Sequence, residues 1–110
     1  MSIKNNIDKG KFCERQAITF FQQQGWKLIA KNHRVGGVEI DLIMKKADTY
    51  LLVEVKSDNL WRQEYPIKKN QKQRLLQAFS AFCEQYKKPV QTLLAIVDQK
   101  GNVQPFDLEF

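Results

Sequence analysis

Two short segments of the chain place carboxylates and a lysine at strand-like spacing. Asp41 lies in the run Val-Glu-Ile-Asp-Leu-Ile at residues 38–43, and Glu54 and Lys56 lie in the run Val-Glu-Val-Lys at residues 53–56. Side chains alternate between the two faces of a strand, so Glu54 and Lys56 share a face. Clustered carboxylates suit Mg²⁺, and a neighbouring ammonium can neutralise phosphate charge or orient a water molecule. The spacing predicts metal-dependent chemistry at a phosphate group.

The two segments are typical of a β-hairpin, and its register decides which side chains meet. If Lys45 pairs with Tyr50 across a four-residue loop, Asp41 lies opposite Glu54 on the same face. Facing carboxylates repel each other, and one of them would have a raised pKa unless a cation offset the charge. We therefore expect Mg²⁺ or Mn²⁺ to bind at this hairpin.

Two further glutamates have two interpretations each. Glu14 shares a side of the first predicted helix with apolar residues and could face Asp41, but spacing alone favours a solvent-exposed carboxylate paired with Arg15 or Lys11. Glu39 would lie opposite Lys56 in the same register. It either joins the acidic face or pairs with a cation at the start of the strand.

Apolar periodicity and turn residues predict the elements that must position the hairpin. Helical spacing predicts two helices, at residues 7–24 and, before Pro89, at residues 69–87. Alternation and uniformly apolar runs predict the flanking strands, at residues 26–31, 92–97 and, as an edge strand interrupted by Pro105, 103–110. Polar and glycine-rich segments predict a loop at 32–37 and a turn at 98–102. The order α-β-β-β-α-β predicts an α/β domain with a mixed sheet flanked by helices, the 92–97 strand lying in its interior and parallel to a neighbour.

Length and charge limit the function classes. The 110 residues suit one domain (1–110), and 18 Lys plus Arg against 12 Asp plus Glu give a net charge of +6, which favours a polyanionic partner such as nucleic acid. No run reaches the roughly 18 apolar residues of a membrane span, and the first residues lack a signal-peptide hydrophobic region. We expect a cytoplasmic protein that does not interact with membranes.

Basic residues around the second predicted helix form a candidate phosphate-binding set. They are Lys68, Lys69, Lys72 and Arg74, with Arg34 and, less directly, Lys45, Lys46 and Arg62. For each residue alone, a solvated charged surface is the favoured interpretation. In the 57–66 segment, Trp61 and Tyr65 either stack on unpaired bases or pack in a core or interface, and packing is favoured for Trp61.

The cysteines and the single histidine offer little catalytic chemistry. Cys13 and Cys83 lie 70 residues apart in apolar helical stripes, which favours reduced buried thiols over a disulfide or a zinc site. His33 lies in a polar segment, which favours contact with phosphate or solvent over a nucleophilic pair.

The acidic hairpin resembles the PD-(D/E)xK nuclease superfamily, in which an acidic residue on one strand precedes Glu-x-Lys on the next. Over roughly residues 10–97 the chain is similar to the bacterial YraN-like family, and parts of it resemble archaeal Holliday-junction resolvases. The resemblance rests on Gly-Lys-Phe-Cys-Glu-Arg at 10–15, Gly-Trp at 25–26, Asn-His-Arg at 32–34, Gly-Val-Glu-Ile-Asp-Leu-Ile at 37–43 and Val-Glu-Val-Lys at 53–56. The chain departs from the family pattern at positions that are not predicted metal ligands, among them Val38, Asp58 and Gln71.

This resemblance implies a restriction-endonuclease-like core and a role for each matched residue. Asp41, Glu54 and the Val55 carbonyl would hold Mg²⁺, Glu14 would assist directly or through water, and Lys56 would orient or activate the nucleophile. It also implies endonucleolytic cleavage of branched DNA, products with a 5′-phosphate and a 3′-hydroxyl, and a homodimer.

Two alternatives from other classes remain open. One is a nucleic-acid-binding domain of the same fold without catalysis, in which the carboxylates and Lys56 form an ion network. The other is an interaction domain of a larger DNA-processing assembly. The residues do not distinguish a four-way junction from a flap, a single strand or RNA, or one metal ion from two.

Overall fold

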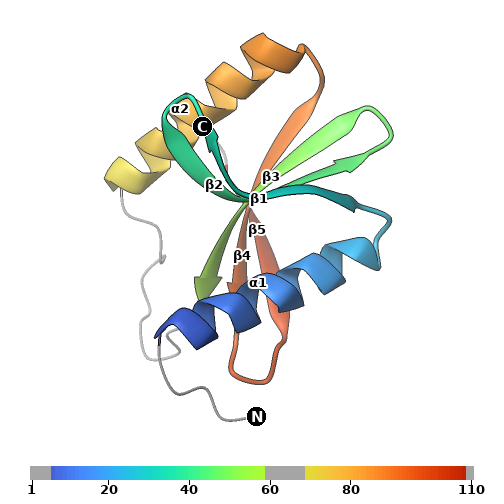
Figure 1. Ribbon diagram of the computed structural model, residues 1–110, viewed down its shortest axis with the longest axis vertical. Coiled ribbons are helices and arrows are strands. Elements are labelled where there is room, and N and C mark those ends of the chain that lie inside the picture. Colours follow the sequence, from blue (N-terminus) through green and yellow to red (C-terminus); the bar gives the residue numbers. More distant parts are fainter. Residues whose placement is uncertain (1–5, 59–68, 109–110) are drawn as a thin grey trace.

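A computed structural model of the protein describes residues 6–58 and 69–108 as a five-stranded sheet between two helices (Figure 1). The elements in chain order are α1 (Asn6–Gln22), β1 (Lys27–Val35), β2 (Val38–Lys46), β3 (Thr49–Ser57), α2 (Lys69–Tyr86), β4 (Val90–Val97) and β5 (Val103–Asp107). The strand order is β1-β2-β3-β4-β5, and only β3 and β4 are parallel. The predicted α/β fold with a mixed, helix-flanked sheet is confirmed.

The helices cover opposite faces of the sheet, and each face has its own hydrophobic core. Adjacent residues of β3 show the division, because Leu51 packs with α1 whereas Leu52 packs with α2. The α1 core contains Ala17, Phe21, Leu42, Met44, Leu51, Val53 and Ala95. The α2 core contains Val35, Ile40, Ile43, Leu52, Leu75, Ala78, Phe82, Leu94 and Leu108. Burial on both faces explains why the central strands are apolar almost throughout.

The β2–β3 hairpin has the register that the sequence predicts. Lys45 pairs with Tyr50, although the strands continue pairing to Lys46 and Thr49, so the turn is two residues shorter than expected. Pairing then runs back along the strands as far as Leu42 opposite Val53. The register at the turn therefore decides which side chains of the two strands share a face, and so which pack against α1 and which against α2.

The first strand is longer than its sequence pattern suggests. The predicted loop at 32–37 is wrong, because β1 continues to Val35 and only Gly36 and Gly37 form the turn into β2. Both glycines have positive φ, 58° and 80°, as the commonest two-residue hairpin turn requires. His33 thus lies on an exposed edge strand, where polar residues are tolerated because one hydrogen-bonding edge faces water.

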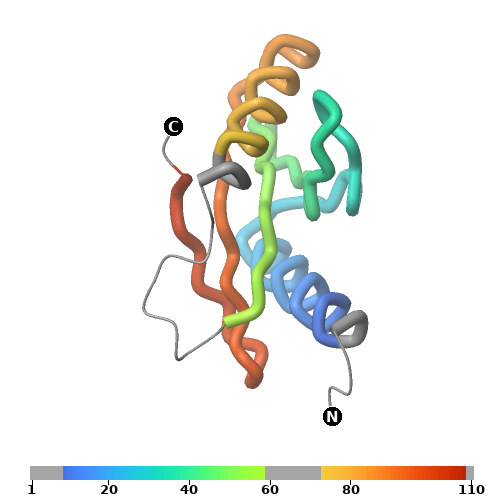
Figure 2. Tube along the Cα trace, turned by 90° about the vertical axis from the view of Figure 1, so that its left-hand side faces the viewer, coloured from blue at the N-terminus to red at the C-terminus, as the bar shows by residue number. Residues whose placement is uncertain are grey.

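The remaining elements lie close to their predicted bounds. The strand expected at 92–97 is β4, which runs parallel to β3 after the α2 crossover, as Figure 2 shows. The last strand is an edge strand, with Pro105 paired to Ala95. Helix α1 ends two residues earlier than expected and α2 one residue earlier. Lys68 and the segment with Trp61, Arg62 and Tyr65 lie outside the described residues. Within the described ranges neither helix has the length and hydrophobicity of a membrane span.

We predict that Gly36→Ala destabilises the protein more than Gly37→Ala does. A Cβ at Gly36 would lie 2.8 Å from the Cβ of Ala81 on α2, whereas a Cβ at Gly37 meets no described atom within 4 Å. Both substitutions carry the cost of positive φ, about 1–2 kcal/mol, and only the first adds a steric clash of about 1–2 kcal/mol. Urea unfolding of both variants measures the difference, and equal losses would show that the hairpin tip does not press on α2.

Candidate active site

The candidate site lies where β2 and β3 separate. Backbone pairing ends at Leu42 and Val53, and the next residue of β2, Asp41, instead accepts a hydrogen bond from the Val55 N–H at 2.8 Å through its Oδ2 atom. Beyond this point β2 pairs only with β1 and β3 only with β4. In Figure 2 the tip of the β1–β2 hairpin stands apart from β3. We call this point, from Asp41 to Val55, the fork.

Glu54 and Lys56 lie on β3 at the fork and form an ion pair. The Lys56 Nζ atom is 3.4 Å from Glu54 Oε1, and the Glu54 side chain is only 11% exposed against 33% for Lys56. The expected pairing of Glu39 with Lys56 does not form, because the ladder between their strands ends first. Glu39 is exposed and lies opposite Arg34 of β1.

Three carboxyl groups around the fork have raised pKa values. The pKa of Glu54 is raised to about 7. Burial is the largest cause and the charge of Asp41 the second, and Lys56 has a smaller opposing effect. Burial also raises the pKa of Asp41, against the lowering by the Val55 hydrogen bond. The pKa of Glu14 is raised by burial first and by the Asp41 charge second. The fork therefore holds more negative charge than its neighbours compensate.

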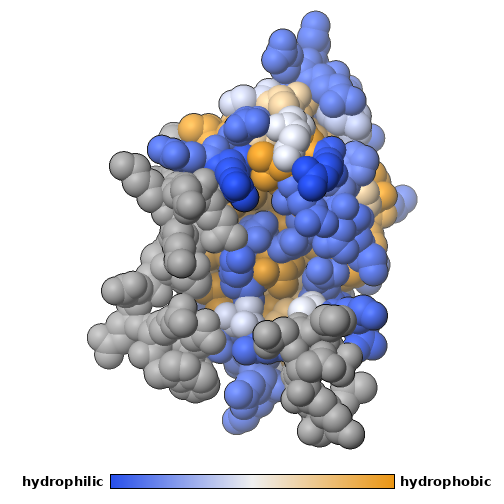
Figure 3. Space-filling model, turned by 60° about the vertical axis from the view of Figure 1, so that its left-hand side comes forward, coloured by the Kyte–Doolittle hydropathy of each residue, from blue (hydrophilic) through white to orange (hydrophobic). Residues whose placement is uncertain are grey.

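Two cavities meet at the carboxylate pair. One, of about 560 Å³, opens toward α2 and is lined by Arg34, Gly37, Val38, Glu39, Asp41, Glu54, Arg74, Leu75 and Gln77. The other, of about 340 Å³, opens toward α1 and is lined by Lys9, Gly10, Cys13, Glu14, Asp41, Glu54, Val55, Lys56 and Ser57. We call them the α2-side and α1-side cavities. Figure 3 shows mostly hydrophilic side chains on the face where the N-terminal ends of both helices come forward.

The structure brings all of the predicted catalytic and metal-binding residues together. The α1-side cavity is lined by Glu14, Asp41, Glu54, Val55 and Lys56. Glu14 thus lies on the same cavity as Asp41, as its first interpretation expects. Their roles in metal binding and catalysis stay predictions.

The predicted nucleic-acid-binding residues divide into three groups. Arg34 and Arg74 line the α2-side cavity, and the Arg34 Nη1 atom donates to the Gly37 carbonyl oxygen at 3.0 Å. Lys69 and Lys72 lie in the first turns of α2, but their side chains are outside the described part of the structure. Lys46 lies at the other end of β2, five residues and roughly 16 Å from Asp41.

The two lysines at the end of β2, Lys45 and Lys46, make contacts with nearby residues. The Lys46 Nζ atom donates to the Gln24 carbonyl oxygen at 2.9 Å and lies 5.0 Å from the centre of the Trp26 ring. Lys45 lies 5.2 Å from the centre of the Tyr50 ring. Lys45 and Lys46 therefore lie at the opposite end of β2 from the start of the fork, and their contact with phosphate stays a prediction.

Two residues of the cavities were not singled out from the sequence. Lys9 lines the α1-side cavity with Glu14, and Gln77 lines the α2-side cavity and donates to the Gly36 carbonyl oxygen at 2.8 Å. The signal for Lys9 was its position four residues before Cys13, which puts both on one face of α1. Gln77 carries no sequence signal, because only the tertiary contact with the β1–β2 turn distinguishes it from its neighbours.

The cysteines fit a structural role. Both are free thiols in the described structure, Cys13 buried and Cys83 half-buried, as expected for reduced thiols in helical stripes. Burial raises the pKa of Cys13, which makes it a poor nucleophile although it lines the α1-side cavity.

The donor set fits a cation that is shared with a substrate. No group of three or more His, Cys, Asp or Glu side chains in residues 6–58 and 69–108 has the arrangement of a complete protein metal site. Mg²⁺, however, is usually held by one or two carboxylates together with water and substrate phosphate. Asp41 and Glu54 supply two desolvated carboxylates of this kind, and the Val55 carbonyl is in the same segment.

We predict that, without divalent cations, the protein becomes less stable as the pH rises from about 5 to 7.5. A raised pKa means that folded Glu54 keeps its proton up to about pH 7, whereas an unfolded glutamate loses it near its ordinary pKa of 4.5. The folded state binds more protons in this window, so the free energy of unfolding should fall by about 2–3 kcal/mol. Urea unfolding in EDTA measures it. Glu54→Gln should flatten the profile, whereas the exposed control Glu84→Gln should not, and parallel profiles for all three proteins would contradict the assignment.

Comparison with known proteins is consistent with this arrangement. An XisH family protein from Nostoc punctiforme PCC 73102 matches with a TM-score of 0.58 over 87% of this chain and 99% of that chain, at 14% identity. This similarity shows a shared fold.

Sequence relatives identify the family. A UPF0102 protein of Herminiimonas arsenicoxydans is 35% identical over 83 residues, covering 73% of this chain and 67% of that protein. One from Synechococcus sp. (strain JA-3-3Ab) is 33% identical over 89 residues, covering 77% of this chain and 66% of that protein. One from Clostridioides difficile (strain 630) is 40% identical over 62 residues, so the match spans 56% of this chain and about half of that protein, 54%. Residues 13–108 match the model of the uncharacterised protein family UPF0102, and the chain therefore belongs to this family, the YraN-like family expected from its motifs.

Proposed function

We propose that the protein is a divalent-metal-dependent endonuclease that hydrolyses phosphodiester bonds in DNA. The observation that carries the proposal is the pair of desolvated carboxylates at the fork, Asp41 and Glu54, with cationic side chains in the cavities on both sides. Carboxylates in this state favour a divalent cation, and the surrounding cations favour a phosphate. A divalent cation bound together with a substrate phosphate offsets the charge of the carboxylates and of the cationic side chains at the same time.

Asp41, Glu54 and the Val55 carbonyl are the groups that would hold Mg²⁺ or Mn²⁺, with Glu14 contributing directly or through a water. When bound, the cation supplies charge neutralisation at the phosphoryl oxygens and lowers the pKa of a coordinated water. Asp41 is fixed for this role, because its Oδ2 atom is held by the Val55 N–H at 2.8 Å. A fixed ligand costs little reorganisation when the site is filled.

The cationic side chains act on the phosphate. In the hydrolysis a bond forms between the water oxygen and phosphorus, and the bond from phosphorus to the 3′ oxygen breaks. Lys56 carries its ammonium 3.4 Å from Glu54, where it can orient the water or neutralise the developing negative charge. Arg34 and Arg74, on the α2 side, can bind neighbouring phosphates and hold the strand in register.

The finer features of this activity follow from the resemblance to junction resolvases. They are branched DNA as substrate, 5′-phosphate and 3′-hydroxyl products, and a homodimer that cuts two strands symmetrically. We also propose a cytoplasmic location, because the sequence has no apolar run long enough for a membrane span. Incubating the protein with labelled linear, flap and four-way DNA in Mg²⁺, Mn²⁺, Ca²⁺ or EDTA tests the activity and ranks these substrates. No cleavage of any substrate in Mg²⁺ or Mn²⁺ would remove the nuclease proposal.

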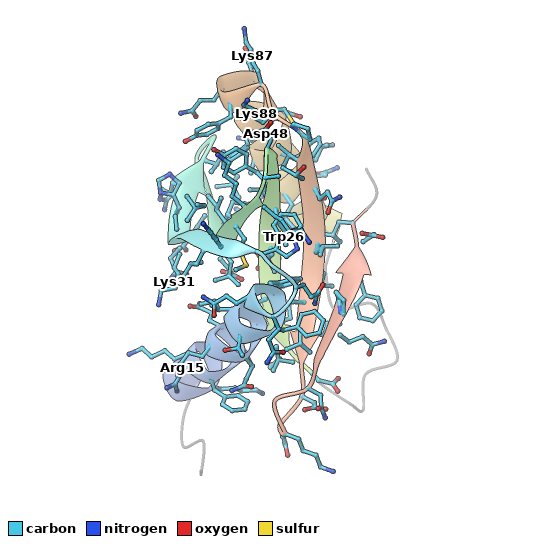
Figure 4. All side chains as sticks on the ribbon, turned by 90° about the vertical axis from the view of Figure 1, so that its right-hand side faces the viewer. Arg15, Trp26, Lys31, Asp48, Lys87 and Lys88 are labelled. Carbon is cyan, nitrogen blue, oxygen red and sulfur yellow. The ribbon has the colours of Figure 1, made fainter. Side chains whose placement is uncertain are left out.

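We predict that the protein binds Mn²⁺ in the micromolar to millimolar range and that Asp41→Asn weakens this binding at least about tenfold, because it removes one of two anionic ligands. Calorimetric titration measures the affinity. Asp48→Asn is the matched control, since Asp48 is an exposed aspartate in the β2–β3 turn, far from the fork along β2 (Figure 4). Identical titrations of wild type and Asp41→Asn would exclude this metal site.

A second function, nucleic-acid binding without catalysis, is favoured by the ion pair between Glu54 and Lys56. The pair partly compensates the buried carboxylate without a metal, and no three-ligand group is present among the described residues. In this alternative Lys56 is structural, and its loss leaves a nearly buried charge unpaired.

Lys56→Ala separates the two functions. If Lys56 is catalytic, cleavage should slow by about a hundredfold or more while DNA affinity stays within a few-fold of wild type. If it is structural, the free energy of unfolding should fall by about 1–3 kcal/mol in EDTA. Cleavage and urea unfolding are measured together, with and without Mg²⁺, and Lys88→Ala serves as an exposed lysine control. Cleavage at the wild-type rate would rule out the proposed role of Lys56.

A further inference from the structure

A third cavity, of about 540 Å³, lies between α1 and β1. Its described lining residues are Gly10, Lys11, Glu14, Arg15, Ile18, Lys31 and Asn32. Two of them, Gly10 and Glu14, also line the α1-side cavity of the fork. The two residues are four apart on α1 and so lie on one face of the helix. We call this third space the α1–β1 cavity, and it adjoins the fork.

The α1–β1 cavity is cationic on its outer side. Lys11, Arg15 and Lys31 are exposed, and Glu14 is the one carboxylate among the described lining residues. Figure 4 shows that the Arg15 and Lys31 side chains extend from α1 and β1 on the same side of the molecule. Three cations around one carboxylate attract an anion.

Gly10 has a position that packing within the protein does not explain. It lies inside α1, where glycine is destabilising relative to alanine. A Cβ added there would meet no described atom within 4 Å, so no neighbour in the described structure requires the missing side chain. A bare helix backbone between two cavities is what the close approach of a ligand requires.

The three cavities form a series through shared residues. The α2-side and α1-side cavities share Asp41 and Glu54, and the α1-side and α1–β1 cavities share Gly10 and Glu14. The carboxylates lie in the middle of this series. Cationic side chains lie at both ends of the series. Arg34 and Arg74 line the α2-side cavity, and Lys11, Arg15 and Lys31 line the α1–β1 cavity.

We propose that the α1–β1 cavity binds the phosphodiester backbone of the substrate strand, which passes over Gly10 and is held on both sides of the bond that is cut. This inference rests on the proposed function and narrows its substrate to strands with phosphates on both sides of the carboxylate pair. Cleavage is then at internal bonds. A substrate ending at the cut bond would leave one cationic end of the series empty.

Side-chain size at Gly10 tests the passage. Gly10→Ala should raise the melting temperature by about 2–6 °C, because alanine is the better helix former and its Cβ meets no described atom within 4 Å. Gly10→Gln should melt no lower than wild type but bind a labelled single-stranded oligonucleotide about tenfold more weakly. Thr19→Gln, at an exposed α1 position that lines none of the three cavities, should bind as wild type does. Wild-type affinity of Gly10→Gln would overturn the proposal.

Charge removal gives an independent measurement of the same contact. The double variant Lys11→Gln with Lys31→Gln should reduce the dependence of log affinity on log salt concentration by about 1.4, since each phosphate contact on a single strand contributes about 0.7. The variant Lys87→Gln with Lys88→Gln removes the same charge at the distant end of α2, as Figure 4 shows, and should change the slope little. Equal slopes for the two double variants would overturn the proposal.

These binding measurements are made in EDTA and in Ca²⁺, apart from cleavage. One outcome is that wild type binds DNA, and the Gly10 and lysine variants behave as expected, while no substrate is cut. This result would support the proposed binding path and contradict the proposed nuclease activity. If wild type cuts DNA but the variants bind normally, the nuclease stands and the path is wrong.

Discussion

The hydrogen bond from the Val55 N–H to Asp41 Oδ2 holds the site together. The last backbone pair of β2 and β3 is Leu42 with Val53, and the bond joins the next residue of β2 to the second residue beyond Val53 on β3. A carboxylate thus takes over where the sheet ladder ends. The donor is satisfied without a backbone acceptor, which lets β2 turn away with β1 while β3 stays with β4. The same bond orients Asp41 next to Glu54. An alanine at position 41 would leave the Val55 N–H without this partner. Asp41 therefore both stabilises the separation of the strands and contributes a carboxylate to the site.

Charge at the fork works against the stability of the protein alone. Burial raises the pKa of Asp41, Glu54 and Glu14. Among the described residues, only Lys56 forms an ion pair with one of these carboxylates, Glu54. A fold selected for stability alone would replace such a group with apolar side chains of similar volume. Retaining the carboxylates makes sense if a cation and a phosphate complete the arrangement, since a bound ligand recovers the desolvation cost as binding free energy.

The sequence predicts what alternation and turn length determine, and it misses what tertiary contacts determine. The Lys45–Tyr50 register followed from a short turn between two strands, although the pairing ends at Leu42 and Val53, before it reaches Asp41 and Glu54. The fork was not predictable, because a period of two gives the face of a side chain but not the residue at which two strands part. The β1 extension was missed because His33 and its neighbours face water on an edge strand and so look like a loop. The approach of Glu14 depended on the packing of α1, and spacing alone favoured the opposite interpretation.

A fork also explains how two helices on opposite faces serve one site. An intact sheet separates its faces, so residues of α1 and α2 could not reach the same carboxylates. At the fork they do, because Asp41 and Glu54 line a cavity with Lys9 and Glu14 on one side and a cavity with Arg74 on the other. One more backbone pair between β2 and β3 would close this opening and divide the cations into two unconnected surfaces. The end of the β2–β3 ladder therefore sets the extent of the substrate path as well as the position of the carboxylates.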